Sequence, residues 1–106
     1  MSYTDTILDR KSLYELLSGF KHGLLVFTSS QCINCEHQRY ILDNYKLPDG
    51  IKSIEIDVDS GSELVGLYAV TKVPTLVMVN SDTLQGLTMR VGITGRVELN
   101  KLMGVK

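Results

Sequence analysis

Polar and apolar residues follow one another with two different periods, and these periods divide the chain into helices and strands. Four sets of positions at helical spacing predict helices: Leu13, Leu16, Leu17 and Phe20; Gln38, Ile41, Leu42 and Tyr45; Leu64, Leu67 and Tyr68; Leu99, Leu102 and Met103. Short apolar or alternating stretches predict four strands, at 24–28, 51–58, 76–79 and 83–91, the last two as a hairpin. Residues Tyr3 to Leu8 can add a short fifth strand.

Polar residues and helix breakers stand where these elements should begin and end. The candidate N-terminal caps are Asp9 or a Ser12–Glu15 capping box, then a Ser60–Glu63 box, and finally Thr94. Pro48 and Gly50 end the second helix, and Gly92 ends the last strand. Helices between strands, with a hairpin near the end, predict an α/β fold of three layers. Its mixed four- to five-stranded sheet has four helices on its two faces, in one domain at 1–106.

Composition and charge exclude several classes of protein. The 106 residues are 43% hydrophobic and 22% charged, which fits one globular domain and argues against intrinsic disorder. A net charge of −1 leaves no basic surface for nucleic acid, and no apolar run approaches the roughly 18 residues of a membrane span. Residues 1–6 lack the layout of a signal peptide, so we expect a cytoplasmic location with no membrane contact. We also expect the protein to be a monomer.

The chain has two cysteines, Cys32 and Cys35, which are too few to staple a small domain. They follow a predicted buried strand and open a predicted helix, where free N–H groups and the helix dipole favour a thiolate. This position should lower the pKa of Cys32 and make it the nucleophile. Cys35, one turn along and more buried, would then attack Cys32 and release the reduced target.

The cysteine pair has two other possible uses. Free cysteines can simply fill core volume, but this spacing and position favour redox use. A zinc or iron–sulfur site normally needs four ligands, and beyond the pair only His22 and His37 are available as soft ligands. We therefore expect no metal, and no cofactor other than the Cys32–Cys35 disulfide itself.

Pro74 and Gly92 are the other informative positions. A proline just ahead of an apolar strand indicates either an ordinary strand start or a fixed kink with a cis bond. Gly92 is either a strand terminator or a place where another backbone comes close.

Together, Cys-Ile-Asn-Cys at 32–35, Val-Pro-Thr-Leu at 73–76 and Val-Gly at 91–92 resemble the thioredoxin family over nearly the whole chain. The resemblance implies a thioredoxin-like fold and a cis peptide at Val73–Pro74 that faces the cysteines across a shallow groove. The backbone of Val73 would pair there with an extended substrate, and Gly92 would leave room beside it. The predicted substrate-binding residues are Gln31, Ile33, Asn34, Val73, Pro74 and Gly92.

The chain departs from that family at three places. The usual active site is Trp-Cys-Gly-Pro-Cys, whereas this chain has no Trp and carries Ile33 and Asn34 between its cysteines. Val26 stands where thioredoxins have a buried Asp, and Ser53 where they have the neighbouring Lys. Both halves of that pair are therefore gone together, and Glu36 or Asp57 is the candidate to replace the acid.

These features favour a thioredoxin-like reductase of protein disulfides, recharged by a thioredoxin reductase or a similar electron donor. A glutaredoxin-like, glutathione-dependent oxidoreductase is the alternative, although the residues around Gly92 lack the Gly-Gly and acidic cap common in that family. A third hypothesis is a non-catalytic module that binds a partner through the same groove. Replacing Cys32 by Ser tests it, because only a binding module would keep its biological role.

Overall fold

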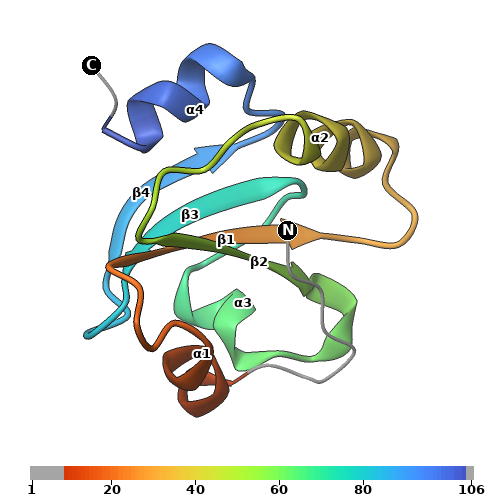
Figure 1. The fold of residues 1–106 in the computed structure, drawn as a ribbon. Helices are drawn as coiled ribbons and strands as arrows, with labels where there is room; N and C mark the ends of the chain where they lie inside the picture. Colours follow the sequence, from red (N-terminus) through yellow and green to blue (C-terminus); the bar gives the residue numbers. More distant parts are fainter. Residues whose placement is uncertain (1–8, 105–106) are drawn as a thin grey trace.

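The computed structural model describes residues 9–104, which alternate between helices and strands as expected (Figure 1). The elements are α1 (Arg10–Leu16), β1 (His22–Thr28), α2 (Ile33–Asp43), β2 (Ile51–Asp57), the 3-10 turn η1 (Val58–Ser60), α3 (Glu63–Leu67), β3 (Thr75–Asn80), β4 (Gly86–Val91) and α4 (Arg96–Leu102). The fifth strand predicted at Tyr3 to Leu8 lies outside the described residues. No helix within residues 9–104 is long and apolar enough to cross a membrane.

The strands form one mixed sheet in the order β2-β1-β3-β4. β1 runs parallel to β2 and antiparallel to β3, and β4 returns antiparallel beside β3. Phe27 on β1 lies opposite Thr75, and Thr75 lies opposite Val91. The C-terminal ends of β1 and β4 and the N-terminal end of β3 therefore lie together at one end of the sheet.

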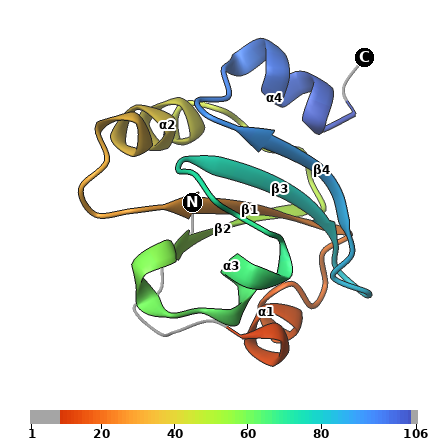
Figure 2. The same cartoon turned by 180° about the vertical axis from the view of Figure 1, so that it is seen from behind.

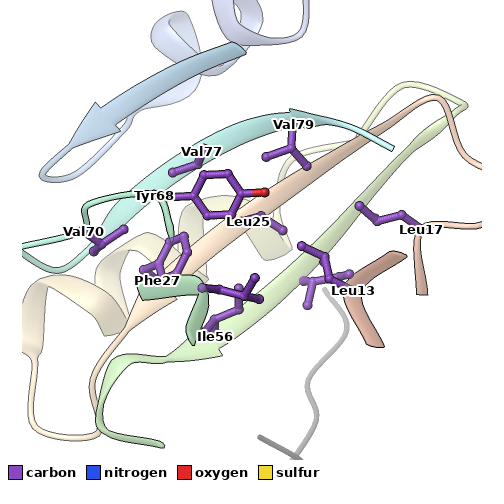
Figure 3. Close-up of a cluster of buried hydrophobic side chains, with 11 residues drawn as sticks. Leu13, Leu17, Leu25, Phe27, Ile56, Tyr68, Val70, Val77 and Val79 are labelled. Atoms are coloured by element: carbon purple, nitrogen blue, oxygen red, sulfur yellow. The ribbon is translucent and has the colours of Figure 1, made fainter. Parts of the chain in front are cut away.

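Two apolar layers hold the sheet between its helices. α1 and α3 cover one face, and α2 and α4 cover the other (Figures 1 and 2). Successive residues of β1 point to opposite faces, so Leu25 and Phe27 pack toward α1 and α3 (Figure 3), whereas Leu24 and Val26 join the layer beneath α2 and α4. Both layers are built around fully buried side chains, and the predicted three-layer α/β fold is confirmed.

The helix starts differ from the predicted capping boxes. Asp9 caps α1, and its carboxylate accepts the N–H of Ser12 at 2.8 Å, which lowers the pKa of Asp9. The Ser12–Glu15 box is therefore wrong, because Ser12 already lies within the first turn. Ser62 caps α3, so the Ser60–Glu63 box is wrong as well, since Ser60 belongs to η1.

Three predicted core positions lie at the surface instead. Leu16, Phe20 and Leu67 are each more than a third exposed. α1 and α3 are short, with 7 and 5 residues, so each turns only a narrow face toward the sheet. Leu13 and Leu17 occupy that face of the first helical segment, and Leu64 and Tyr68 occupy it in the third.

Candidate functional site

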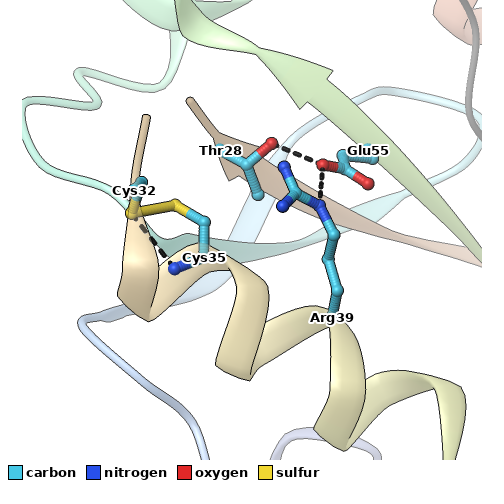
Figure 4. A network of polar contacts seen from close by, with 5 residues as sticks. All are labelled: Thr28, Cys32, Cys35, Arg39 and Glu55. Carbon is cyan, nitrogen blue, oxygen red and sulfur yellow. Dashed lines mark hydrogen bonds and ion pairs between the residues drawn. A yellow bond between two sulfur atoms is a disulfide. The ribbon is translucent and has the colours of Figure 1, made fainter. Parts of the chain in front are cut away.

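The two cysteines lie where the end of β1 passes into α2, and they form a disulfide (Figure 4). Cys32 is the N-cap of α2, and its Sγ accepts the backbone N–H of Cys35 at 3.1 Å. The Cα atoms are 5.1 Å apart. The start of the helix therefore directs a donor at the Cys32 sulfur, an arrangement that stabilises a thiolate once the bond is reduced.

The two sulfur-bearing residues differ in accessibility. Cys32 is partly exposed, whereas Cys35 is fully buried beneath the first turn of α2. This difference in burial matches the one predicted from the sequence. An incoming thiol or disulfide can reach Cys32 first, and only Cys32 lies beside Cys35.

Pro74 lies just before β3, at the end of the sheet where β1 also ends. The Val73–Pro74 peptide bond is cis, as the resemblance to thioredoxins implied. The carbonyl of Pro74 accepts the N–H of Gly92 at 2.8 Å, so the segments before β3 and after β4 are joined at this end of the sheet. A hollow of about 300 Å³ adjoins Val73 and is lined by Val58, Val65, Val70, Thr71, Lys72 and Val73.

The backbone conformation at position 92 favours glycine. Its φ of +88° lies in the left-handed region that glycine adopts easily and other residues do not. A Cβ built there would meet nothing within 4 Å, so no other part of the described chain crowds it. That Gly92 leaves space for a bound partner stays a prediction.

The remaining predicted contact residues surround the disulfide at the surface. Gln31, Ile33 and Asn34 are exposed, and Ile33 as a whole residue is 83% accessible. Val73 is partly exposed, whereas Pro74 is buried.

The structure contains no arrangement of metal ligands among its described residues. Within residues 9–104, no group of three or more His, Cys, Asp or Glu side chains could hold a metal ion. His22 lies at the start of β1, and His37 is exposed on α2.

Beneath α2, Val26 and Ser53, which stand at the positions predicted for the family's acid and lysine, are both buried and uncharged. The predicted replacements do not lie there. Glu36 is exposed on α2, and the Asp57 carboxylate accepts the N–H of Asp59 at the start of η1.

A buried acid is nevertheless present, at Glu55 on β2, which is 4% exposed. Its Oε2 accepts the hydroxyl of Thr28 at 2.6 Å and the Nε–H of Arg39 at 2.7 Å (Figure 4). The sequence offered one signal for it. Ile54 and Ile56 face one side of β2, so Glu55 faces the other, and helices cover both faces of this sheet.

A second polar contact fastens α2 to the segment that follows Gly92. Gln38 is fully buried, accepts the N–H of Thr94 at 2.6 Å and donates to the Thr94 carbonyl at 3.0 Å. The prediction that Thr94 caps the last helix is wrong, because Thr94 is used in this contact and Gly95 is the N-cap of α4.

Comparisons with solved structures identify the fold. The chain is 22% identical to the germline-specific thioredoxin Deadhead from Drosophila melanogaster, with a TM-score of 0.80 over 100% of both chains. It is 18% identical to Fasciola hepatica thioredoxin, with a TM-score of 0.78 over 98% of this chain and 97% of that one. It is 23% identical to a mutant thioredoxin from Halobacterium salinarum, with a TM-score of 0.78 over 95% of this chain and 85% of that one.

Sequence comparison supplies the family. No curated protein gives a significant match to the sequence. The family model described as "TraF: F plasmid transfer operon protein" matches residues 10–101. Because this match spans most of the chain, the protein belongs to the TraF family, and its structure has the thioredoxin-like fold that its cysteine, proline and glycine motifs implied.

Proposed function

We propose that this chain is a thioredoxin-like protein disulfide oxidoreductase that works as a reductase. The observation that carries the proposal is the Cys32–Cys35 disulfide at the start of α2, with one cysteine accessible and the other buried. A purely structural disulfide would not need an exposed member at a helix N-terminus, where thiolates are stabilised.

The proposed cycle begins with both cysteines reduced. The Cys32 thiolate attacks one sulfur of a target disulfide, and the other target sulfur leaves as a thiolate that takes up a proton from solvent. Cys35 then loses its proton and attacks the Cys32 sulfur, which breaks the mixed disulfide and re-forms the Cys32–Cys35 bond. The second target sulfur leaves in this step as a thiolate and takes up the second proton. The target thus gains two electrons and two protons, and the chain has given up two electrons, the Cys35 proton and the proton that Cys32 released when it ionised.

Substrate binding is proposed beside the disulfide, at the end of the sheet where β3 starts and β4 stops. An extended segment of a disulfide-containing protein would pair with the backbone of Val73, next to Pro74 and Gly92. Gln31, Ile33 and Asn34 would contact it from the start of α2. The mostly apolar hollow beside Val73 is large enough for one side chain of that segment.

The finer assignments complete the proposal. The chain carries electrons on its own cysteine pair and needs no other cofactor, and a thioredoxin reductase or similar donor reduces it again. It acts as a monomer. Both cysteines of the chain belong to one exchangeable pair, which suits the reducing cytosol, where structural disulfides are rare.

Three variants test the cycle in an assay of protein disulfide reduction with glutathione or a thioredoxin reductase as donor. Cys32→Ser should abolish turnover, and Cys35→Ser should accumulate a mixed disulfide with the target. Ser30→Ala, at an exposed neighbour, should retain full activity. Turnover that survives Cys32→Ser contradicts the proposal. A biological role that survives it indicates a binding module instead, and a preference for glutathione over the reductase indicates the glutaredoxin-like alternative.

A further inference from the structure

The contact between Arg39 and Glu55 is the only ion pair among residues 9–104, although 22% of the whole chain is charged. A carboxylate as buried as Glu55 needs donors, because an unpaired buried charge is costly. Arg39 and Thr28 supply them, and both donate to the same oxygen of Glu55. The ion pair therefore ties α2 to β2, with the end of β1 between them.

The ion pair lies close to the cysteines. Arg39 follows Cys35 by four residues on α2, so the two side chains leave the helix on the same face, one turn apart. Thr28 is the last residue of β1, four residues before Cys32. Figure 4 shows the disulfide and the three polar side chains gathered on the side of α2 that faces the sheet.

Opposite charges in this place act on a thiolate in opposite directions. A guanidinium beneath the pair favours a thiolate, and a carboxylate opposes it. The other charged or titratable side chains around this end of the sheet are Glu36 and His37 on α2, Lys72 ahead of Pro74, and Asp57 and Asp59 after β2, where Asp59 accepts the hydroxyl of Ser29 at 2.9 Å. Asp57 is partly exposed and the other four are exposed, so solvent weakens their effect.

We propose that the Arg39–Glu55 pair sets the balance between disulfide and dithiol at Cys32–Cys35 by keeping the net charge beneath the cysteines near zero. This inference rests on the proposed function, because it takes the pair to cycle between the two states. Arg39 and Glu55 are positioning residues here, since they act on the cysteines through charge and do not touch the reacting sulfurs.

The relevant equilibrium is reduction by glutathione. Two glutathione thiols give up two electrons and form one new disulfide, the Cys32–Cys35 bond breaks, and the chain is left with two thiols. Cys32 then releases its proton to the buffer. Any charge that stabilises the resulting thiolate draws the equilibrium toward the dithiol.

Two single substitutions separate the charges. Glu55→Gln keeps the shape and leaves Arg39 unneutralised, so the thiolate should form at lower pH and the reduced fraction should rise. Arg39→Met leaves the carboxylate alone and should do the opposite. A charge within about one helical turn shifts such an ionisation by about tenfold in its equilibrium constant. The double variant Glu55→Gln/Arg39→Met should return to within about twofold of the native chain, since it restores a neutral site.

Two readouts are used on variants whose folding is checked by circular dichroism. The first is the midpoint pH of thiolate formation, from the pH dependence of iodoacetamide alkylation of the reduced chain. The second is the reduced fraction in a glutathione buffer at about pH 8.5, where an ordinary thiol is half ionised and shifts in both directions are visible. For a thiol half ionised at that pH, a tenfold stronger ionisation raises the reduction equilibrium constant about fivefold, roughly 20 mV, and a tenfold weaker one lowers it about twofold, roughly 9 mV; we expect the first for Glu55→Gln and the second for Arg39→Met.

Matched controls remove the same charges elsewhere. Asp43→Asn at the far end of α2 and Lys11→Met on α1 alter exposed side chains and should move neither readout. If the buried Glu55→Gln does not fold, Arg39→Gln keeps the test in force, because the Arg39 side chain is 31% exposed and tolerates replacement more easily.

Shifts of the same sign in both single variants, or no shift in either, overturn the inference and leave the pair a structural clamp. Neither readout needs a protein substrate. Opposite shifts in a chain that cannot reduce protein disulfides would therefore uphold this inference and refute the proposed function. Full reductase activity without opposite shifts would do the reverse.

Discussion

Gln38 makes a buried polar contact whose loss should measurably destabilise this fold. Gln38→Met keeps the length of the side chain and removes both groups that bond to the Thr94 backbone, at 2.6 and 3.0 Å. Thr94 is only 2% exposed, so water cannot replace them. Each abandoned backbone group costs about 1–3 kcal/mol, and we expect a loss of about 3 kcal/mol in the free energy of unfolding.

Urea unfolding followed by circular dichroism measures this loss, with Asn44→Ala as the matched control. Asn44 also donates from its side chain to a backbone carbonyl, that of Tyr40, at 2.8 Å in the same helical segment, but this contact is exposed. Its removal should change the free energy of unfolding by no more than about 0.5 kcal/mol. A loss below about 1 kcal/mol for Gln38→Met, or an equal loss for Asn44→Ala, would refute the reasoning.

Two further predictions concern the backbone and the pH dependence of stability. Gly92→Ala should lower the free energy of unfolding by about 1–2 kcal/mol because of its positive φ, whereas Gly66→Ala inside α3 should raise it by about 0.5–1 kcal/mol. A Cβ meets nothing within 4 Å at either site, so equal effects in urea unfolding would contradict the backbone explanation. Burial raises the pKa of Tyr68 above 10.0, so the fold favours the neutral phenol. This stability is present below pH 10.0 and lost as pH rises toward the folded-state pKa; alkaline urea titrations should show less loss in Tyr68→Phe.

The sequence predicts the types of element and most of the core, because burial on a helix or strand repeats with a fixed period. The first residue of a helix is harder to predict. Asp9 and Ser12 are both good caps, and residue type alone does not decide between them. Thr94 shows the same limit, since its backbone is used by Gln38, a residue 56 positions away.

The site divides in the same way. The cysteine pair, Pro74 and Gly92 carry local signals that can be read from neighbouring residues. Glu55 was missed because its partners lie 16 and 27 residues away, on a helix and on another strand. Its burial depends on α2 covering that face of β2, and this packing of a helix on a strand is part of the tertiary structure. A charged residue between two buried isoleucines, in a sheet covered on both sides, is the pattern that would have revealed it.

The sheet that separates the two apolar layers has a consequence for how the chain tolerates change. Every residue of β1 from Gly23 to Thr28 is buried, yet successive side chains serve different layers. Sequence drift on the side of α1 and α3 can therefore proceed with little effect on the layer beneath the disulfide. The backbone of the sheet separates these two sets of side chains, so a substitution in one apolar layer removes contacts from that layer and not from the other.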